Sequence, residues 1–134
     1  MVMQSYETMS IHSDRDVVLV RQAVRKFAVE LGFSLVDQTK IVTAASELAR
    51  NTLEHGGGGT VQLEALHEGI RAGVRLTFED SGPGIPDIEL ALKDGFTTRG
   101  GLGMGLGGTK RLVNEFNIVS RVGEGTRVTI TKWK

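Results

Sequence analysis

The sequence contains no cysteine, no excess charge of either sign and no long apolar run. Without cysteine, disulfides, thiolate nucleophiles and thiolate zinc sites are excluded. Lys and Arg together number 16, and Asp and Glu together also number 16, so the formal net charge is zero. No net electrostatic field therefore draws the chain to nucleic acid or acidic lipid. No stretch approaches the roughly twenty apolar residues that a membrane span needs, and the N-terminus lacks a signal-peptide pattern. These absences predict a cytoplasmic protein that contacts neither nucleic acid nor membrane.

Glycine, in contrast, is abundant and clustered. The 134-residue chain has 18 glycines, most of them within 56–59, 82–84 and 100–108. Clustered glycine marks positions where the backbone turns sharply or approaches a ligand closely. The chain length suits a single domain over residues 1–134, built around one core.

Hydrophobic periodicity predicts two long helices in the first half of the chain. Ser13 and Ser34 each precede an acidic residue by three positions, which is the spacing of a capping box, and Gly32 is typical of the end of the first helix. The second helix is predicted to run to about residue 55. A brief helix over 86–93, with proline at its first position, and a third long helix over 107–116 are predicted to follow.

The remaining periodicity is that of strands. The predicted strands cover residues 4–11, 60–66, 70–78, 117–122 and 126–133. In the strand over 70–78, Ile70 and every second residue after it form one apolar face, which predicts a sheet with one buried side. The order of elements predicts an α+β fold with two layers, a mixed but mostly antiparallel sheet with helices packed on one face.

Glu47 and Asn51 lie four positions apart near the end of the second predicted helix, so they share one face of it. The amide oxygen of Asn51 is a hard, neutral ligand for Mg²⁺, and the carboxylate of Glu47 can accept or orient the proton of a nucleophile. Such a pair is also common on solvated helix faces, so the spacing alone does not define a site.

A glycine-rich turn, Asp80-Ser81-Gly82-Pro83-Gly84-Ile85, follows a predicted strand directly. The Asp80 carboxylate can accept a charge-assisted hydrogen bond from an exocyclic amine such as that of adenine, and the glycines let a flat ring approach. An ordinary turn accounts for the same composition.

A second glycine-rich stretch, Gly101 to Gly108, precedes the third predicted long helix. Unobstructed backbone N–H groups at a helix N-terminus form an anion site. The pattern is neither the Rossmann fingerprint nor a P-loop. Lys110, Arg111 and Arg99 lie close enough in sequence to contact a phosphate, and each is equally compatible with a solvated surface.

In this order, Glu-x-x-x-Asn on a helix, Asp-x-Gly-x-Gly after a strand and Gly-x-Gly-x-Gly before a helix resemble the N, G1 and G2 boxes of the GHKL superfamily of ATPases and kinases. The resemblance implies the two-layer Bergerat fold and a site for ATP and Mg²⁺. It implies that Asn51 holds the Mg²⁺ ion, that Asp80 and Thr126 hold adenine, and that the glycines of the second stretch lie near the phosphates. The implied ATP-binding residues are Asn51, Asp80, Gly82, Gly84, Ile85, Gly101, Leu102, Gly103, Met104, Gly105, Leu106 and Thr126.

Nearly the whole chain is similar to one branch of this superfamily, the anti-sigma-type protein-serine kinases that include the switch kinases of the bacterial stressosome. The matching segments are 30–33, 46–51, 79–85, 94–96, 100–103 and 132–133. A four-glycine loop at 56–59 and Arg99 depart from the pattern.

The branch implies phosphoryl transfer from Mg·ATP to a serine or threonine of a STAS-domain partner. Glu47 is the implied proton acceptor, and Arg50, Arg99 and Lys110 are candidate phosphate contacts. Once released from its STAS scaffold, a kinase of this branch activates a PP2C-type phosphatase, a step in partner switching during the stress response.

Two other classes of protein are weighed against this one. A sensor histidine kinase needs an acceptor histidine on a dimerising helical hairpin, and His12, at the end of a predicted strand, has no such helix before it. His55 ends the second predicted helix and His67 lies near a turn, so surface or packing roles are favoured for these two. A nucleotide-responsive adaptor, which sequesters a sigma factor or activates a phosphatase with little kinase activity, has no need of Glu47 and Asn51.

Overall fold

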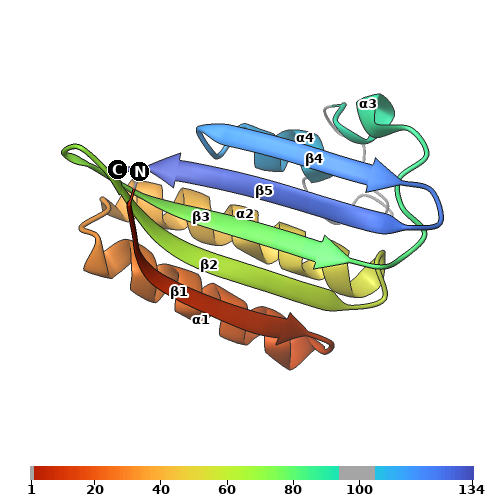
Figure 1. Cartoon of the computed structure of the whole chain (residues 1–134), viewed down its shortest axis with the longest axis horizontal. Coiled ribbons are helices and arrows are strands. Elements are labelled where there is room, and N and C mark those ends of the chain that lie inside the picture. The colour runs from red at the N-terminus through yellow and green to blue at the C-terminus, as the bar shows by residue number, and fades with distance from the viewer. Residues whose placement is uncertain (1, 94–104) are drawn as a thin grey trace.

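In a computed structural model, residues 2–93 and 105–134 are described, and they form one sheet covered by helices on one face (Figure 1). The elements in chain order are β1 (Val2–Ile11), α1 (Asp14–Glu30), α2 (Leu35–Glu54), β2 (Gly59–Glu68), β3 (Arg71–Asp80), α3 (Ile88–Ala91), α4 (Gly105–Lys110), β4 (Glu115–Arg121) and β5 (Gly125–Trp133).

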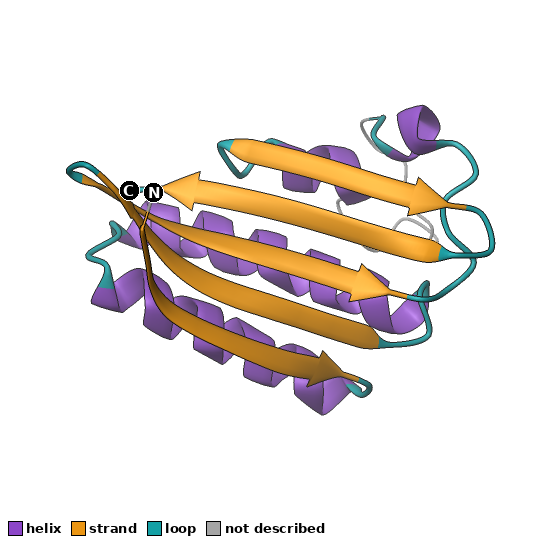
Figure 2. Cartoon of the chain, viewed as in Figure 1, coloured by secondary structure: helices purple, strands orange, loops and turns teal. Residues whose placement is uncertain are grey.

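The five strands are arranged in the order β1-β2-β3-β5-β4, and every pairing among them is antiparallel. The sequence predicted a mixed, mostly antiparallel sheet, and the structure corrects only the mixed part of this, because all four pairings are antiparallel. The predicted two-layer α+β architecture, with helices on one face, is confirmed (Figure 2).

The two long helices begin where their capping residues place them. Ser13 accepts a hydrogen bond from Asp16 N at 3.2 Å, and the Asp16 carboxylate accepts one from His12 N, one residue before the cap, at 2.9 Å. Ser34 accepts a hydrogen bond from Asp37 N at 3.1 Å and so caps α2. Gly32, with φ of 81°, has the left-handed conformation that turns the chain between the two helices.

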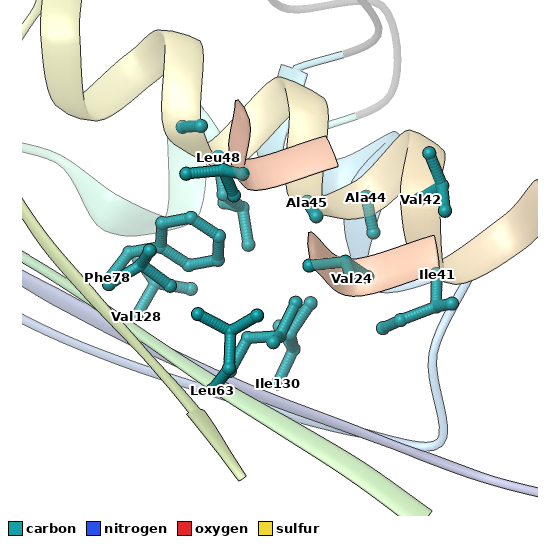
Figure 3. Packing of buried hydrophobic residues seen from close by; sticks show 14 of the residues in the cluster. Val24, Ile41, Val42, Ala44, Ala45, Leu48, Leu63, Phe78, Val128 and Ile130 are labelled. Atoms are coloured by element: carbon teal, nitrogen blue, oxygen red, sulfur yellow. The ribbon is translucent and has the colours of Figure 1, made fainter. Parts of the chain in front are cut away.

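The core lies between the helices and the sheet. Ile41, Ala45 and Leu48 form a buried row along α2, and they pack against apolar side chains of β2, β3 and β5 such as Leu63 and Ile130 (Figure 3). This row fixes the rotation of α2 about its axis and therefore sets the direction in which its other side chains point.

The third long helix predicted over 107–116 is wrong. Helix α4 ends at Lys110, and Phe116 lies in β4, which pairs with β5 along its whole length. Residues 115–121 alternate between exposed and half-buried, and pairing with β5 uses that alternation. Pairing with β5 in a hairpin has therefore overridden a spacing that also suits a helix.

Two smaller expectations also need correction. Ile70 does not lie on the buried face of β3, because it belongs to the β2–β3 turn and is fully exposed. The short helix α3 spans only Ile88–Ala91 and is capped by Asp87, whose carboxylate accepts from Leu90 N at 3.0 Å, so Pro86 precedes the cap.

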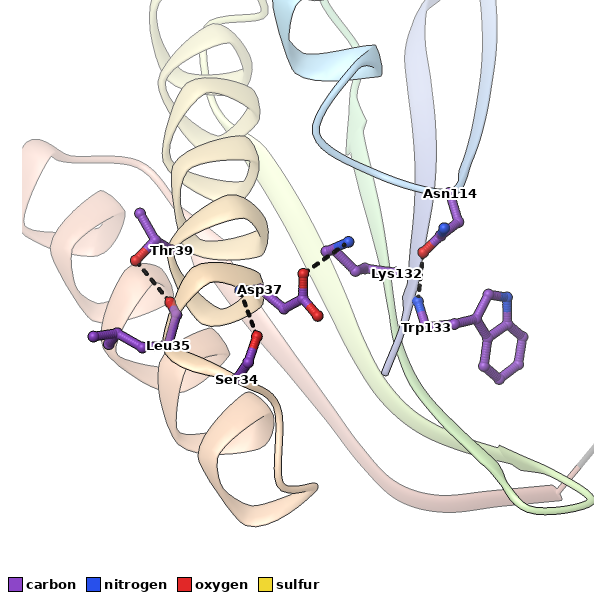
Figure 4. Close-up of polar contacts among 7 residues, drawn as sticks. All are labelled: Ser34, Leu35, Asp37, Thr39, Asn114, Lys132 and Trp133. Atoms are coloured by element: carbon purple, nitrogen blue, oxygen red, sulfur yellow. Dashed lines mark hydrogen bonds and ion pairs between the residues drawn. The ribbon is translucent and has the colours of Figure 1, made fainter.

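A buried lysine ties the start of α2 to the sheet (Figure 4). Lys132 lies on the helix-facing side of β5 with 9% of its side chain exposed, and its Nζ is 3.5 Å from Asp37 Oδ1, whose side chain is 30% exposed. The ammonium is thus the more deeply buried partner of the ion pair, so it loses more hydration on folding.

This asymmetry predicts unequal effects of the two single substitutions. Asp37→Asn leaves a buried ammonium without its carboxylate and should lower the free energy of unfolding by about 2 kcal/mol. Lys132→Met keeps the aliphatic stem and leaves only a partly hydrated carboxylate, so it should cost under about 1 kcal/mol. Urea unfolding measures both, and Asp14→Asn, in the first turn of α1, controls for the helix dipole. A larger loss for Lys132→Met would contradict the assignment.

Candidate functional site

A cavity of about 270 Å³ opens between the C-terminal end of α2 and the ends of β3 and β5. Apolar side chains form most of its wall, and a few polar groups converge on it, which is the usual composition of a small-ligand site. The lining residues are Leu48, Asn51, Thr52, His55, Phe78, Asp80, Ile85, Pro86, Asp87, Leu90, Ala91, Gly105, Leu106, Thr126 and Val128.

Six of the residues implicated from the sequence meet in this cavity. They come from segments far apart in the chain: α2, β3 with the turn after it, α4 and β5. The six are Asn51, Asp80, Ile85, Gly105, Leu106 and Thr126. Gly101, Leu102, Gly103, Met104 and Arg99 lie outside the described residues. The ligand roles of all these residues remain predictions.

Asp80 is held in place by its backbone surroundings. Its Oδ1 accepts a hydrogen bond from Gly82 N at 2.9 Å. A Cβ added at Gly56, just beyond α2, would lie 2.3 Å from Asp80 Cγ, so only glycine lets the end of α2 approach the carboxylate this closely. Gly56 was not singled out in the sequence, where it is hidden within a run of four glycines.

Gly82 and Gly84 have packing roles in the structure, and neither lines the cavity. A Cβ at Gly82 would lie 2.7 Å from Gly56 Cα, and one at Gly84 would lie 2.4 Å from Arg121 O. Gly84 also has φ of 78°. The two glycines therefore fit the turn after β3 against α2 and β4, and this contact places Asp80 and Ile85 at the cavity.

Thr126 is the neighbour of Asp80 across the β3–β5 pairing, and Ser120 is its neighbour across the β4–β5 pairing. The Oγ atoms of Ser120 and Thr126 are 2.7 Å apart. Ser120 Oγ also accepts a hydrogen bond from Ile85 N at 2.8 Å. Ser120 was missed in the sequence, and the register of the final hairpin, which aligns it with Thr126, is the signal that indicates it.

Glu47 lies one turn before Asn51 on α2 but is not among the cavity-lining residues. Its side chain is 13% exposed, and its Oε1 is 3.6 Å from Arg50 Nη1. Arg50, a candidate phosphate contact in the sequence analysis, thus forms an ion pair with Glu47. The pair lies at the edge of the site, and Arg50 is positioned to hold the carboxylate in one orientation.

Other ionisable groups lie around the site. Lys110, a candidate phosphate contact, is exposed at the end of α4. His55, to which the sequence gave a surface or packing role, is exposed and also lines the cavity, one turn after Asn51. Within residues 2–93 and 105–134, no group of three or more His, Asp or Glu side chains is placed to hold a metal ion.

Comparison with known proteins agrees with this geometry. Residues 36–134 match the family described as histidine kinase-, DNA gyrase B- and HSP90-like ATPases. The chain is 46% identical to the serine/threonine-protein kinase RsbT of Bacillus subtilis, over 98% of both chains. It is 36% identical to the anti-sigma F factor of Anoxybacillus flavithermus, over 84% of this chain and 80% of that protein.

A solved structure shares the fold. The crystal structure of the RsbU and RsbW domains of a Mycobacterium tuberculosis protein superposes with a TM-score of 0.66 at 24% sequence identity. The match covers 98% of this chain and 33% of the mycobacterial one. Among the described residues, no helix is both long and apolar enough to cross a membrane.

Proposed function

Because the chain belongs to the family of histidine kinase-, DNA gyrase B- and HSP90-like ATPases and, within it, to the serine/threonine-protein kinases of the RsbT type, we propose that it transfers a phosphoryl group from Mg·ATP to a STAS-domain protein. Once released from that protein, it activates a PP2C-type phosphatase in a bacterial stress pathway, in the cytoplasm. The observation that carries the proposal is the convergence of Asn51, Asp80 and Thr126 on one apolar cavity.

The cavity is suited to the adenine end of ATP. Phe78, Leu48 and Val128 provide apolar surface for a flat ring, and Asp80 and Thr126 lie side by side on neighbouring strands. A carboxylate accepts from an exocyclic amine, and a hydroxyl beside it can serve the adjacent ring nitrogen. The shape and the polar groups together support a purine that carries an amino group.

Asn51 fits the role of Mg²⁺ ligand. Its amide is a neutral oxygen donor on a rigid helix, and Mg²⁺ in nucleotide sites takes few protein ligands because phosphate and water oxygens complete its shell. The absence of an acidic cluster among the described residues is consistent with a metal that is held largely by the nucleotide. When bound, Mg²⁺ neutralises charge on the phosphates during transfer.

Glu47 is assigned the role of general base, which accepts the proton of the acceptor hydroxyl. Its carboxylate is largely sheltered from water, and Arg50 at 3.6 Å restricts its orientation. Glu47 lies on the same helix as Asn51 and one turn earlier, so it borders the phosphate end of the site rather than the adenine end. An incoming serine or threonine would complete the arrangement from the partner's side.

The substitution Asn51→Ala tests the metal role. Wild-type protein should bind ATP about tenfold more tightly with Mg²⁺ than with EDTA, and the variant should lose that gain, because one oxygen ligand is removed from the ion. Calorimetric titration measures both affinities, and Asn117→Ala, an exposed position in β4 that does not line the cavity, is the control for general effects. A variant that keeps its response to Mg²⁺ would remove Asn51 from the metal site.

Radiolabelled ATP tests the transfer itself. The chain, Mg²⁺ and a STAS-domain protein are incubated together, and label should appear on the STAS protein and be stable to acid, as a phosphoserine or phosphothreonine is. The alternative of an adaptor predicts capture of the partner on a column without labelling. Label on this chain alone would contradict the proposed direction of transfer.

A further inference from the structure

We propose that Ser120 is a positioning residue that sets the direction of the Thr126 hydroxyl, so that Thr126 donates its proton to a ring nitrogen of the purine. This inference rests on the proposed function, because it concerns how the cavity reads the base of ATP. Nothing in the motifs of the sequence marks Ser120, and it does not itself line the cavity.

Strand register places Ser120, Thr126 and Asp80 in one row. Thr126 pairs with Ser120 on β4 and with Asp80 on β3, so the three residues lie side by side across three strands. Side chains at directly paired positions project from the same face of a sheet. The row therefore runs from the sheet edge to the carboxylate at the cavity wall.

Ser120 Oγ has one proton and three close neighbours. Ile85 N donates to it at 2.8 Å, Gly125 O lies at 3.2 Å, and Thr126 Oγ1 lies at 2.7 Å. The Ile85 N–H can only donate and the Gly125 carbonyl can only accept. The direction of the bond between the two hydroxyls is the one variable that the geometry leaves open.

The two directions present different groups to the cavity. If Ser120 donates to Gly125 O, Thr126 must donate to Ser120 and can offer the cavity only lone pairs. If Ser120 donates to Thr126, the proton of Thr126 is released for a ligand. Both directions use the 2.7 Å contact between the hydroxyls, and only the first also uses the 3.2 Å contact with Gly125 O, so an acceptor atom of the ligand beside Thr126 is what selects the second direction.

The second direction matches an aminopurine edge. Asp80 then accepts from the exocyclic amine, and Thr126 donates to the adjacent ring nitrogen. Guanine presents a carbonyl and a ring N–H at the equivalent positions, so it opposes an acceptor with an acceptor. Asp80 thus accepts from the base and Thr126 donates to it, and Ser120, by donating to Thr126 Oγ1, holds the Thr126 hydroxyl in the donating orientation.

Ser120 also holds Ile85, which lines the cavity, so its loss has a structural consequence as well. A change of ligand separates the two effects. In 1-deaza-ATP the ring nitrogen beside the amino-bearing carbon is replaced by C–H, so it deletes one acceptor and keeps the size of the base. The loosening of Ile85 should weaken both nucleotides equally, whereas loss of the Thr126 bond should weaken only ATP.

The affinities of ATP and 1-deaza-ATP are therefore measured for wild type, Ser120→Ala and Thr126→Val. Wild type should prefer ATP by about tenfold, the value of one well-aligned hydrogen bond, and both variants should show a preference below about twofold. Thr126→Val leaves the Ser120–Ile85 contact in place, so it reports on the hydroxyl without disturbing the loop. Circular dichroism confirms that each variant is folded.

Equal weakening of both nucleotides by Ser120→Ala, with the tenfold preference kept, would overturn the inference and leave the proposed function intact. A wild type that binds ATP but does not distinguish the two nucleotides would overturn it as well. A wild type that binds neither nucleotide would remove the proposed function, and the inference with it.

Discussion

Glu47→Gln is expected to lower the rate of phosphoryl transfer by about 10²- to 10⁴-fold, the usual contribution of a general base, and to leave the affinity for Mg·ATP within about twofold. Glutamine has the same shape but cannot accept the hydroxyl proton as a carboxylate does. Glu47 does not line the cavity, so nucleotide affinity is not expected to depend on it. Single-turnover transfer of label to the STAS partner measures the rate separately from binding.

Glu54→Gln, at the end of the same helix, is the matched control and should change the rate little. Arg50→Gln adds a second comparison, because it removes the ion pair at 3.6 Å while keeping the carboxylate. It should cost less than Glu47→Gln. A Glu47→Gln enzyme that transfers phosphate at the wild-type rate would show that Glu47 is not the proton acceptor.

Asp80→Asn is expected to weaken ATP binding by about 10- to 100-fold, since a hydrogen bond to a charged group is worth about 1.5–3 kcal/mol. The amide oxygen can still accept from Gly82 N, as Oδ1 does at 2.9 Å, so the turn after β3 should keep its structure. The amide NH₂ then takes the place of the second carboxylate oxygen and faces the adenine amine donor to donor. The preference for ATP over GTP should fall accordingly.

Competition binding with ATP and GTP measures this change, and thermal unfolding checks that the variant stays folded. Asp87→Asn is a useful comparison, because Asp87 also lines the cavity but its Oδ1 caps α3. If Asp80→Asn kept its full selectivity for ATP, Asp80 would not be the residue that reads the base.

Local signals in the sequence were sufficient to predict the two long helices, α1 and α2. Ser13 and Ser34 cap α1 and α2 at the expected residues, because capping depends on contacts within one turn. The inward row of α2 was equally readable, and it determined that Asn51 faces the cavity. These features need no information from distant parts of the chain.

Features that depend on strand register and on packing between elements were not predicted from the sequence. Phe116 was placed in a helix because its spacing from earlier apolar residues suits one, whereas β5 holds it in a strand. Ser120 has meaning only once β4 and β5 are in register, and Gly56 only once α2 is packed against Asp80. Gly101, Gly103 and Gly105 were placed near the phosphates by resemblance, and of these only Gly105 lies within the described residues.

The central claim is that one nucleotide lies in the cavity bounded by α2, β3 and β5. A titration of ¹⁵N-labelled protein with Mg·ATP, followed through backbone amide shifts, locates the nucleotide directly. The account predicts the largest shifts at Asn51, Leu106 and Thr126, which line this cavity. Shifts confined instead to His12, Gly58 and Thr60, which line a neighbouring polar hollow and not this cavity, would contradict it.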